Sequence, residues 1–139
     1  MDEPRWLLRE EVDVIHWELI EEHGGSHGIR DEDAIESALA RPRHKWAYQE
    51  EADLPTLGVA YGYGLAKNHG YVDGNKRVAF FSLVLFLRRN GLLLRAPQGE
   101  VVQMMRGVAA GKHEEEDLAR WVRHHVQKRK NPGEGDRVR

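Results

Sequence analysis

The chain has 139 residues, a formal net charge of −2 and no cysteine. This length suits one domain, and a hydrophobic content of 40% is enough for a buried core, which argues against a disordered chain. The small net charge offers no basic field for direct nucleic-acid binding, and the lack of cysteine excludes disulfides and cysteine-based zinc sites. The charged N-terminus is unlike a signal peptide, and the longest apolar run, 78–87, is shorter than the about 20 residues that span a bilayer. We therefore expect a cytoplasmic protein that binds neither membrane nor nucleic acid.

Helical patterns begin soon after the N-terminus. Apolar residues recur at helical spacing over 10–22, and Gly24 and Gly25 end this pattern. Asp31 is a good N-cap for a second helix, and the acidic residues that follow it suit the positive end of the helix dipole. Pro42 is expected to end this helix, because proline lacks the N–H that a helical hydrogen bond needs.

The next segment, 43–53, has no helical period, and it predicts an exposed loop or a short hairpin. Asp53 is expected to cap a third helix, which extends to about Asn68. Gly58 and Gly62 lie four residues apart, so they share one face of this helix. Two glycines on one face favour close packing against a neighbouring helix.

Within 75–90, every residue from Val78 to Leu87 except Ser82 is apolar. A helix that is apolar on all sides is buried on all sides, so this segment predicts the central helix. Further helices are predicted over 100–109 and 114–130. Because strands and helices do not alternate, we expect an all-α fold, with one compact domain over 1–130 and a frayed tail over 131–139.

A polar segment leads into the predicted central helix, with the sequence His69-Gly70-Tyr71-Val72-Asp73-Gly74-Asn75-Lys76-Arg77. The N-terminus of a helix presents unpaired N–H groups and a partial positive charge, which together favour an anion. Gly74 lets the backbone approach a ligand closely. Lys76 and Arg77 add positive charge suited to phosphate groups. The segment therefore predicts a phosphate site.

Two further residues of this segment suit a transfer reaction. Asp73 provides oxygen ligands of the kind that Mg²⁺ takes together with the phosphates of a substrate. His69 can accept a proton from an attacking hydroxyl near neutral pH. Each residue alone is common in ordinary turns and solvated helix ends, but their ordered combination before an apolar helix favours group transfer from a nucleotide.

Other phosphate and metal motifs do not fit. Neither a P-loop nor the pattern Gly-x-Gly-x-x-Gly occurs in the chain. Among the eight histidines, His124 and His125 are adjacent and point in different directions on a helix, while His23 and His27 flank two glycines that interrupt helical structure. Surface histidines are therefore favoured over a zinc site.

The polar segment resembles the signature of the Fic/Doc family, whose usual form is His-x-Phe-x-Asp/Glu-Gly/Ala-Asn-Gly/Lys-Arg. The resemblance extends from Val12 to about Val126 and includes the Gly-Ile-Arg-Asp sequence at 28–31. Gly70 stands where the family often has proline, and Tyr71 stands where it usually has phenylalanine.

Two departures from the AMP-transferring members of the family concern the phosphates. Lys76 takes the place of a glycine, and Phe80 takes the place of a second arginine. Both changes are typical of the Doc branch, a group of toxins that the resemblance associates with phosphate transfer to elongation factor Tu. The resemblance therefore implies an ATP-dependent kinase toxin that modifies a hydroxyl, expected to be that of a threonine, and arrests protein synthesis.

The resemblance also implies roles for individual residues. His69 would be the general base, and Asp73 would bind Mg²⁺. The nucleotide phosphates of ATP would be contacted by Gly74, Asn75, Lys76 and Arg77, with Asn75 holding either the loop or a phosphate oxygen. A flap that positions the target would be formed by Lys45, Trp46, Ala47 and Tyr48.

Regulation is expected to come from a second protein. Many Fic proteins carry an inhibitory helix with the pattern Ser/Thr-x-x-x-Glu-Gly/Asn, and Glu134 is the one glutamate here followed by glycine or asparagine, with Lys130 four residues before it. The resemblance instead implies a separately encoded Phd-type antitoxin. Two alternatives stay open: transfer of AMP to a protein hydroxyl, and a catalytically silent module that holds an anion with the same loop.

Overall fold

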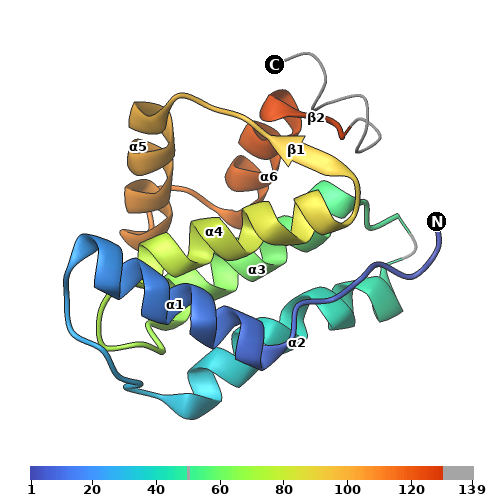
Figure 1. Cartoon of the computed structure of the whole chain (residues 1–139). Coiled ribbons are helices and arrows are strands. Elements are labelled where there is room, and N and C mark those ends of the chain that lie inside the picture. The colour runs from blue at the N-terminus through green and yellow to red at the C-terminus, as the bar shows by residue number, and fades with distance from the viewer. Residues whose placement is uncertain (50, 130–139) are drawn as a thin grey trace, which may run out of the picture.

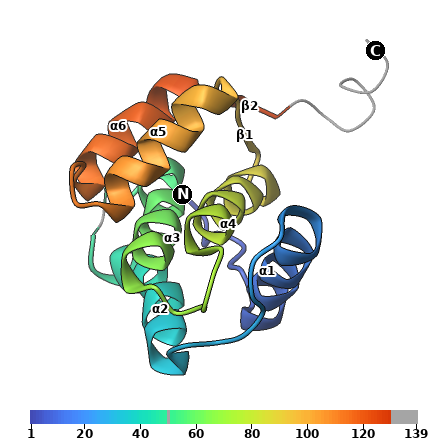
Figure 2. The ribbon, with the colours of Figure 1, turned by 90° about the vertical axis from the view of Figure 1, so that its left-hand side faces the viewer.

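The computed structural model describes residues 1–49 and 51–129, and this part of the chain forms six helices and one two-stranded sheet. The elements are α1 (Arg9–His23), α2 (Glu32–Tyr48), α3 (Leu54–Asn68), α4 (Asn75–Arg89), β1 (Leu92–Leu94), α5 (Gln98–Ala109), α6 (Glu115–His125) and β2 (Val126–Lys128). The helices form three layers, with α3 and α4 in the middle, α1 and α2 on one side, and α5 and α6 on the other (Figures 1 and 2). The predicted all-α fold is confirmed.

The predicted caps and the close packing of the third helix are also confirmed. The Asp31 carboxylate accepts a hydrogen bond from the N–H of Ala34 at 3.1 Å, which starts α2. The Asp53 carboxylate starts α3 in the same way. A Cβ atom on Gly62 would lie 2.9 Å from the side chain of Leu83. The absence of a side chain at Gly62 therefore allows the close approach of α3 and α4.

The second helix does not end at Pro42, and the expected loop or hairpin over 43–53 is wrong for its first six residues. α2 continues through Pro42 to Tyr48. Proline removes only one helical N–H, and side chains on either side of it hold the last turns in place. Arg41 pairs with Glu115 of α6 at 2.6 Å, and Lys45 pairs with the same carboxylate at 3.7 Å. These tertiary contacts outweigh the helix-breaking preference of proline.

The central helix is less buried than its composition predicted. Val78 and Leu83 are fully buried, but the side chain of Phe81 is 47% exposed. One face of α4 reaches the surface, because α1 and α5 lie on either side of it without closing over it (Figure 2). An apolar composition therefore does not imply burial on every side.

The last helix is shorter than predicted. α6 ends at His125, and β2 follows it in antiparallel pairing with β1, Leu92 opposite Lys128. Three-residue strands are too short to show a period in the sequence, so neither strand was expected. The predicted tail, 131–139, lies outside the described residues, and the division into one domain and a tail stays a prediction. None of the described helices has the length and apolar character needed to cross a membrane.

Candidate active site

The polar segment forms a loop between the two central helices. α3 ends because His69 adopts a left-handed conformation, with φ of 49° and ψ of 49°. Gly74, with φ of 78°, adopts a similar conformation directly before α4. His69 is the one non-glycine residue with positive φ among the described residues, and its side chain is exposed to solvent. Strained backbone of this kind is often found at functional sites.

The loop is fastened to the segment that precedes α2. The carbonyl oxygen of Gly70 accepts hydrogen bonds from the N–H groups of Arg30 and Asp31 at 2.8 and 2.9 Å. The guanidinium of Arg30 donates to the carbonyl oxygen of His69 at 2.9 Å. Apart from the cap at Asp31, the sequence singled out this segment only by its resemblance to the family. The structure shows its physical contribution, which is to fix the backbone at His69.

Asn75 holds the loop closed from inside. Its side-chain oxygen accepts from the N–H of Tyr71 at 3.0 Å, and its Nδ2 donates to the carbonyl oxygen of Tyr71 at 2.9 Å. Of the two roles expected for Asn75, the structure therefore displays the first, support of the loop. Tyr71 itself is 2% exposed, so its ring anchors the loop in the core.

The hydroxyl of Tyr71 has a partner in α1. It donates a hydrogen bond of 2.6 Å to the carboxylate of Asp13. Burial, together with this contact to Asp13, raises the pKa of the Tyr71 phenol above its ordinary value. The phenol therefore stays protonated at neutral pH and acts as a donor.

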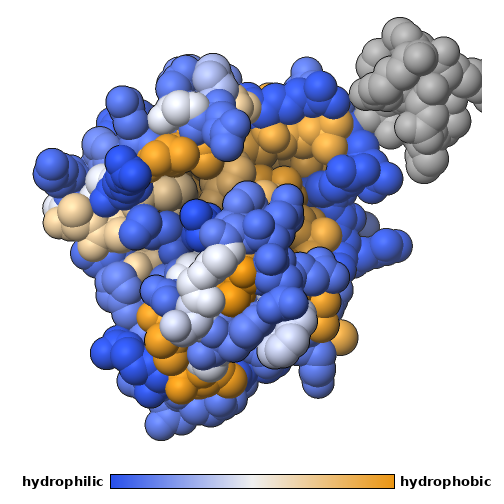
Figure 3. All heavy atoms as spheres, turned by 60° about the vertical axis from the view of Figure 1, so that its left-hand side comes forward, coloured by the Kyte–Doolittle hydropathy of each residue, from blue (hydrophilic) through white to orange (hydrophobic). Residues whose placement is uncertain are grey.

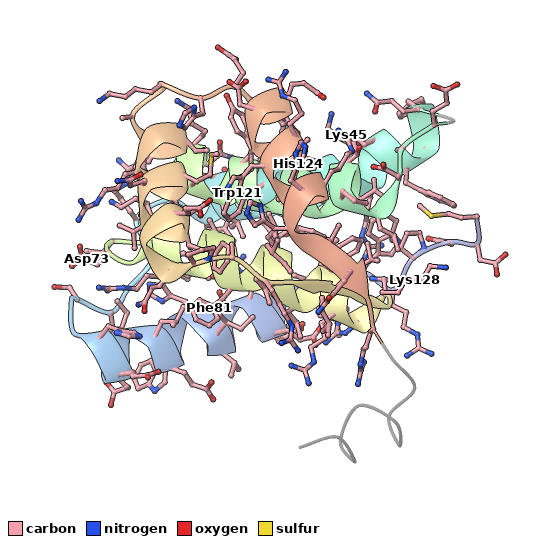
Figure 4. The ribbon with its side chains drawn as sticks, turned by 90° about the horizontal axis from the view of Figure 1, so that it is seen from above. Lys45, Asp73, Phe81, Trp121, His124 and Lys128 are labelled. Atoms are coloured by element: carbon pink, nitrogen blue, oxygen red, sulfur yellow. The ribbon has the colours of Figure 1, made fainter. Side chains whose placement is uncertain are left out.

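Asp73 projects from the edge of the molecule (Figure 4). Its Oδ2 accepts a hydrogen bond from the N–H of Ser26 at 2.9 Å, and its backbone carbonyl oxygen lies 2.7 Å from Nε2 of His16. In the described part of the chain, no three His, Asp or Glu residues form a group that could hold a metal. A single exposed carboxylate fits Mg²⁺, which is commonly bound by one or two carboxylates, water and the phosphates of a substrate.

The cationic residues lie at the start of α4. Lys76 and Arg77 are exposed in its first turn, next to the N–H groups that its N-terminus leaves unpaired. Neither side chain forms an ion pair within the described residues. Phe80 packs against the core, as expected from its place in the apolar run. Lys76 and Arg77 are thus available to an anion at the loop.

The structure does not bring Lys45, Trp46, Ala47 and Tyr48 to this loop. Asn68 donates to the carbonyl oxygen of Ala34, which places the loop at the first turns of α2. Lys45 lies about three helical turns, or about 16 Å, further along the same helix. Figure 4 shows Lys45 and Asp73 on opposite sides of the molecule. These four residues are helical and far from the candidate site, so the structure offers no flap in their place.

Comparison with known proteins is consistent with this geometry. The Fic/DOC family matches residues 6–87. The chain is 34% identical to "Protein kinase doc" of Escherichia phage P1 over 108 aligned residues, and this alignment covers 77% of the chain and 84% of that protein. The chain is 40% identical to "Toxin Doc" of Mycolicibacterium smegmatis over 76 aligned residues, and this alignment covers 52% of the chain and 57% of that protein. The family match begins before α1 and ends within α4, so it includes every segment that holds the loop, and the chain belongs to the Fic/DOC family.

Proposed function

We propose that the chain is a toxin that transfers phosphate from ATP to a protein hydroxyl. The target is a translation factor, elongation factor Tu, and the modified hydroxyl is that of a threonine. This modification arrests protein synthesis. The observation that carries this proposal is the exposure of His69, Asp73 and the cationic start of α4 on one loop. An anion-binding module would need neither a base nor a metal ligand beside its cations. The name of the phage relative, a protein kinase, supports the same reaction.

In the proposed reaction, His69 removes the proton from the target hydroxyl as its oxygen attacks the γ-phosphorus of ATP. The bond between this phosphorus and the β–γ bridging oxygen breaks, and ADP leaves. The N–H groups at the start of α4, with Lys76 and Arg77, stabilise the negative charge on the phosphates. Mg²⁺, when bound at Asp73, would neutralise charge on the same phosphate oxygens.

Two features favour phosphate transfer over AMP transfer. Lys76 adds an ammonium at the loop, where the AMP-transferring relatives have glycine. Phe80 is partly buried and packs against the core, so an apolar ring stands where those relatives have their second arginine. The two cations in the first turn of α4, Lys76 and Arg77, suit one end of a triphosphate rather than its whole length.

The proposal includes a Phd-type antitoxin as the restraining partner, in the cytoplasm. Figure 3 shows apolar side chains gathered in a band across one face of the molecule, between hydrophilic surroundings. Among the exposed apolar residues are Phe81 of α4, 47% exposed, and Val102 of α5, 41% exposed. Exposed apolar patches of this kind commonly mark a surface that a partner covers.

The test is to incubate the purified chain with elongation factor Tu and ATP labelled at either the γ- or the α-phosphate. We expect transfer of the γ-label and a mass increase of the target of about 80 Da, whereas AMP would add about 329 Da. The His69→Ala variant is the control for contaminating kinases. Transfer of the α-label would instead establish AMP transfer, and binding of ATP without transfer to any protein would favour the silent module.

A further inference from the structure

A buried histidine lies directly beneath the candidate site. His16, on the inner face of α1, is 4% exposed. Burial of an imidazole is unfavourable unless the ring is hydrogen-bonded. Its Nε2 lies 2.7 Å from the backbone carbonyl oxygen of Asp73. A carbonyl oxygen can only accept a hydrogen bond, so Nε2 is the protonated ring nitrogen and acts as the donor. The acceptor belongs to Asp73, the residue that is expected to bind Mg²⁺.

The orientation of this ring is fixed from the side. His16 stacks on Tyr71, with ring centroids 3.8 Å apart and an angle of 11° between the planes. Tyr71 is in turn held by its hydrogen bond to Asp13, one turn before His16 on α1. Asp13 also accepts from the guanidinium of Arg9 at 3.0 Å. Rotation of the His16 ring would therefore break both the stack and the hydrogen bond.

Asp73 is held at a second point by the turn that follows α1. The N–H of Ser26 donates to Oδ2 of Asp73 at 2.9 Å. Gly25, with φ of 109°, brings this turn so close that a Cβ atom on it would lie 3.4 Å from the Cβ atom of Asp73. α1 and its turn thus hold the backbone of Asp73 through His16 and its carboxylate through Ser26. The second carboxylate oxygen, Oδ1, accepts no hydrogen bond from the described residues, and Asp73 is exposed to solvent.

We propose that His16 is a positioning residue for Asp73, and that its hydrogen bond sets the affinity of the loop for Mg²⁺ together with a nucleotide. This inference rests on the proposed function, in which Asp73 binds Mg²⁺. A hydrogen bond to a ligand residue fixes the direction of its oxygens before the metal arrives. Loss of such an outer contact typically reduces metal affinity or activity by about 10–100-fold.

Two variants separate the hydrogen bond from the packing. His16→Phe keeps an aromatic ring to stack on Tyr71 and removes the donor, whereas His16→Gln keeps a donor and removes the ring. Binding of a non-hydrolysable ATP analogue is measured by calorimetry in the presence of Mg²⁺. We expect His16→Phe to bind about 10–100-fold more weakly than wild type, and His16→Gln to lose less. Val12→Ala, at a fully buried position on the same helix, is the control for a general loss of stability.

A second measurement needs no variant. The ¹⁵N resonances of the His16 ring report which nitrogen carries the hydrogen, and we expect Nε2. Addition of Mg²⁺ and the analogue should shift this resonance, because the carbonyl group of Asp73 responds when its carboxylate binds the metal. This measurement decides the question if His16→Phe does not fold.

Unchanged binding by His16→Phe, with a melting temperature lowered as in Val12→Ala, would overturn the positioning role and leave His16 as a packed core residue. An unshifted His16 resonance on Mg²⁺ and analogue binding would also overturn it. Weaker binding by His16→Phe, in a protein whose wild type transfers no phosphate to any target, would overturn the proposed function but support the positioning role.

Discussion

A Cβ atom on Gly70 would lie 2.3 Å from Cγ1 of Ile35, because the loop rests directly on the first turns of α2. Gly70 stands where the Fic/Doc signature often has proline. In this chain the position tolerates no side chain while Ile35, which is 1% exposed, keeps its place in the core. The departure from the signature is thus explained by packing.

We expect Gly70→Ala to lower the free energy of unfolding by about 1–3 kcal/mol, because the added methyl group overpacks the contact with Ile35. The loss should be smaller when Ile35 is already alanine, since Ile35→Ala removes the opposing Cγ1 atom. Gly99→Ala is the matched control, because a Cβ atom there meets nothing within 4 Å. Denaturant unfolding of the four variants measures the coupling, and equal losses in both backgrounds would contradict this explanation.

The general base is tested at an exposed position. His69→Ala should reduce phosphate transfer by about 10²–10⁴-fold, because proton removal in the transition state is lost. The free energy of unfolding should change by no more than about 0.5 kcal/mol, since the side chain is exposed and alanine keeps the Cβ atom that the left-handed backbone already carries. His124→Ala, an exposed histidine on α6 away from Asp73 (Figure 4), controls for loss of a surface imidazole. Full toxicity of His69→Ala in cells would exclude the assigned role.

The sequence predicts local features of this fold better than tertiary ones. Asp31 and Asp53 cap helices as expected, because a cap depends on hydrogen bonds within one turn. Pro42 lies inside a helix because Glu115, distant in sequence, holds the residues on both sides of it. No local pattern contains that contact, and none contains the pairing of β1 with β2.

The candidate site shows the same division. The signature residues follow one another in the chain, so their place on one loop could be predicted. The support of that loop could not, because His16 and Ser26 come from a distant segment and show no spacing that relates them to Asp73. Four residues assigned to a flap by resemblance lie at the far end of α2 instead.

Ser82 is fully buried in α4, and within the described residues its hydroxyl oxygen has no hydrogen-bond partner. Such a group loses its contacts with water on folding and regains none. We expect Ser82→Ala to raise the free energy of unfolding by about 1 kcal/mol, measured by denaturant titration. A loss of similar size would show that the hydroxyl has a partner in solution.

Tyr71 makes stability depend on alkaline pH. Its pKa is raised in the folded protein, above the ordinary value of 10.0. As pH rises past about 10, the unfolded chain releases the phenolic proton while the folded chain keeps it, so the unfolded state is favoured and stability falls. The contribution of the protonated Tyr71 to stability is fully present below about pH 10, the ordinary pKa of the phenol. Denaturant midpoints at pH 8 and about pH 11 should therefore differ less for Tyr71→Phe than for wild type. Burial also raises the pKa of Tyr61, so the stability of the variant should keep a smaller dependence on pH. An equal slope in both proteins would contradict the assignment to Tyr71.

Lys76 tests whether charge at the loop selects phosphate transfer. Lys76 is exposed in the first turn of α4, the turn whose unpaired N–H groups would face the phosphates. Lys76→Gly introduces the residue of the AMP-transferring relatives, and we expect phosphate transfer to fall on the order of 10–100-fold as a charge-assisted contact is lost.

Glycine also weakens the start of the helix by about 1 kcal/mol, so Lys76→Ala separates the loss of charge from the loss of helix stability. Lys76→Arg keeps the charge and should retain most of the transfer. Transfer is followed with γ-labelled ATP and the mass of the target. Undiminished phosphate transfer by both Lys76→Gly and Lys76→Ala would show that the ammonium does not act on the transferred group. The choice of phosphate over AMP would then have to depend on Phe80, which stands where the AMP-transferring relatives have their second arginine.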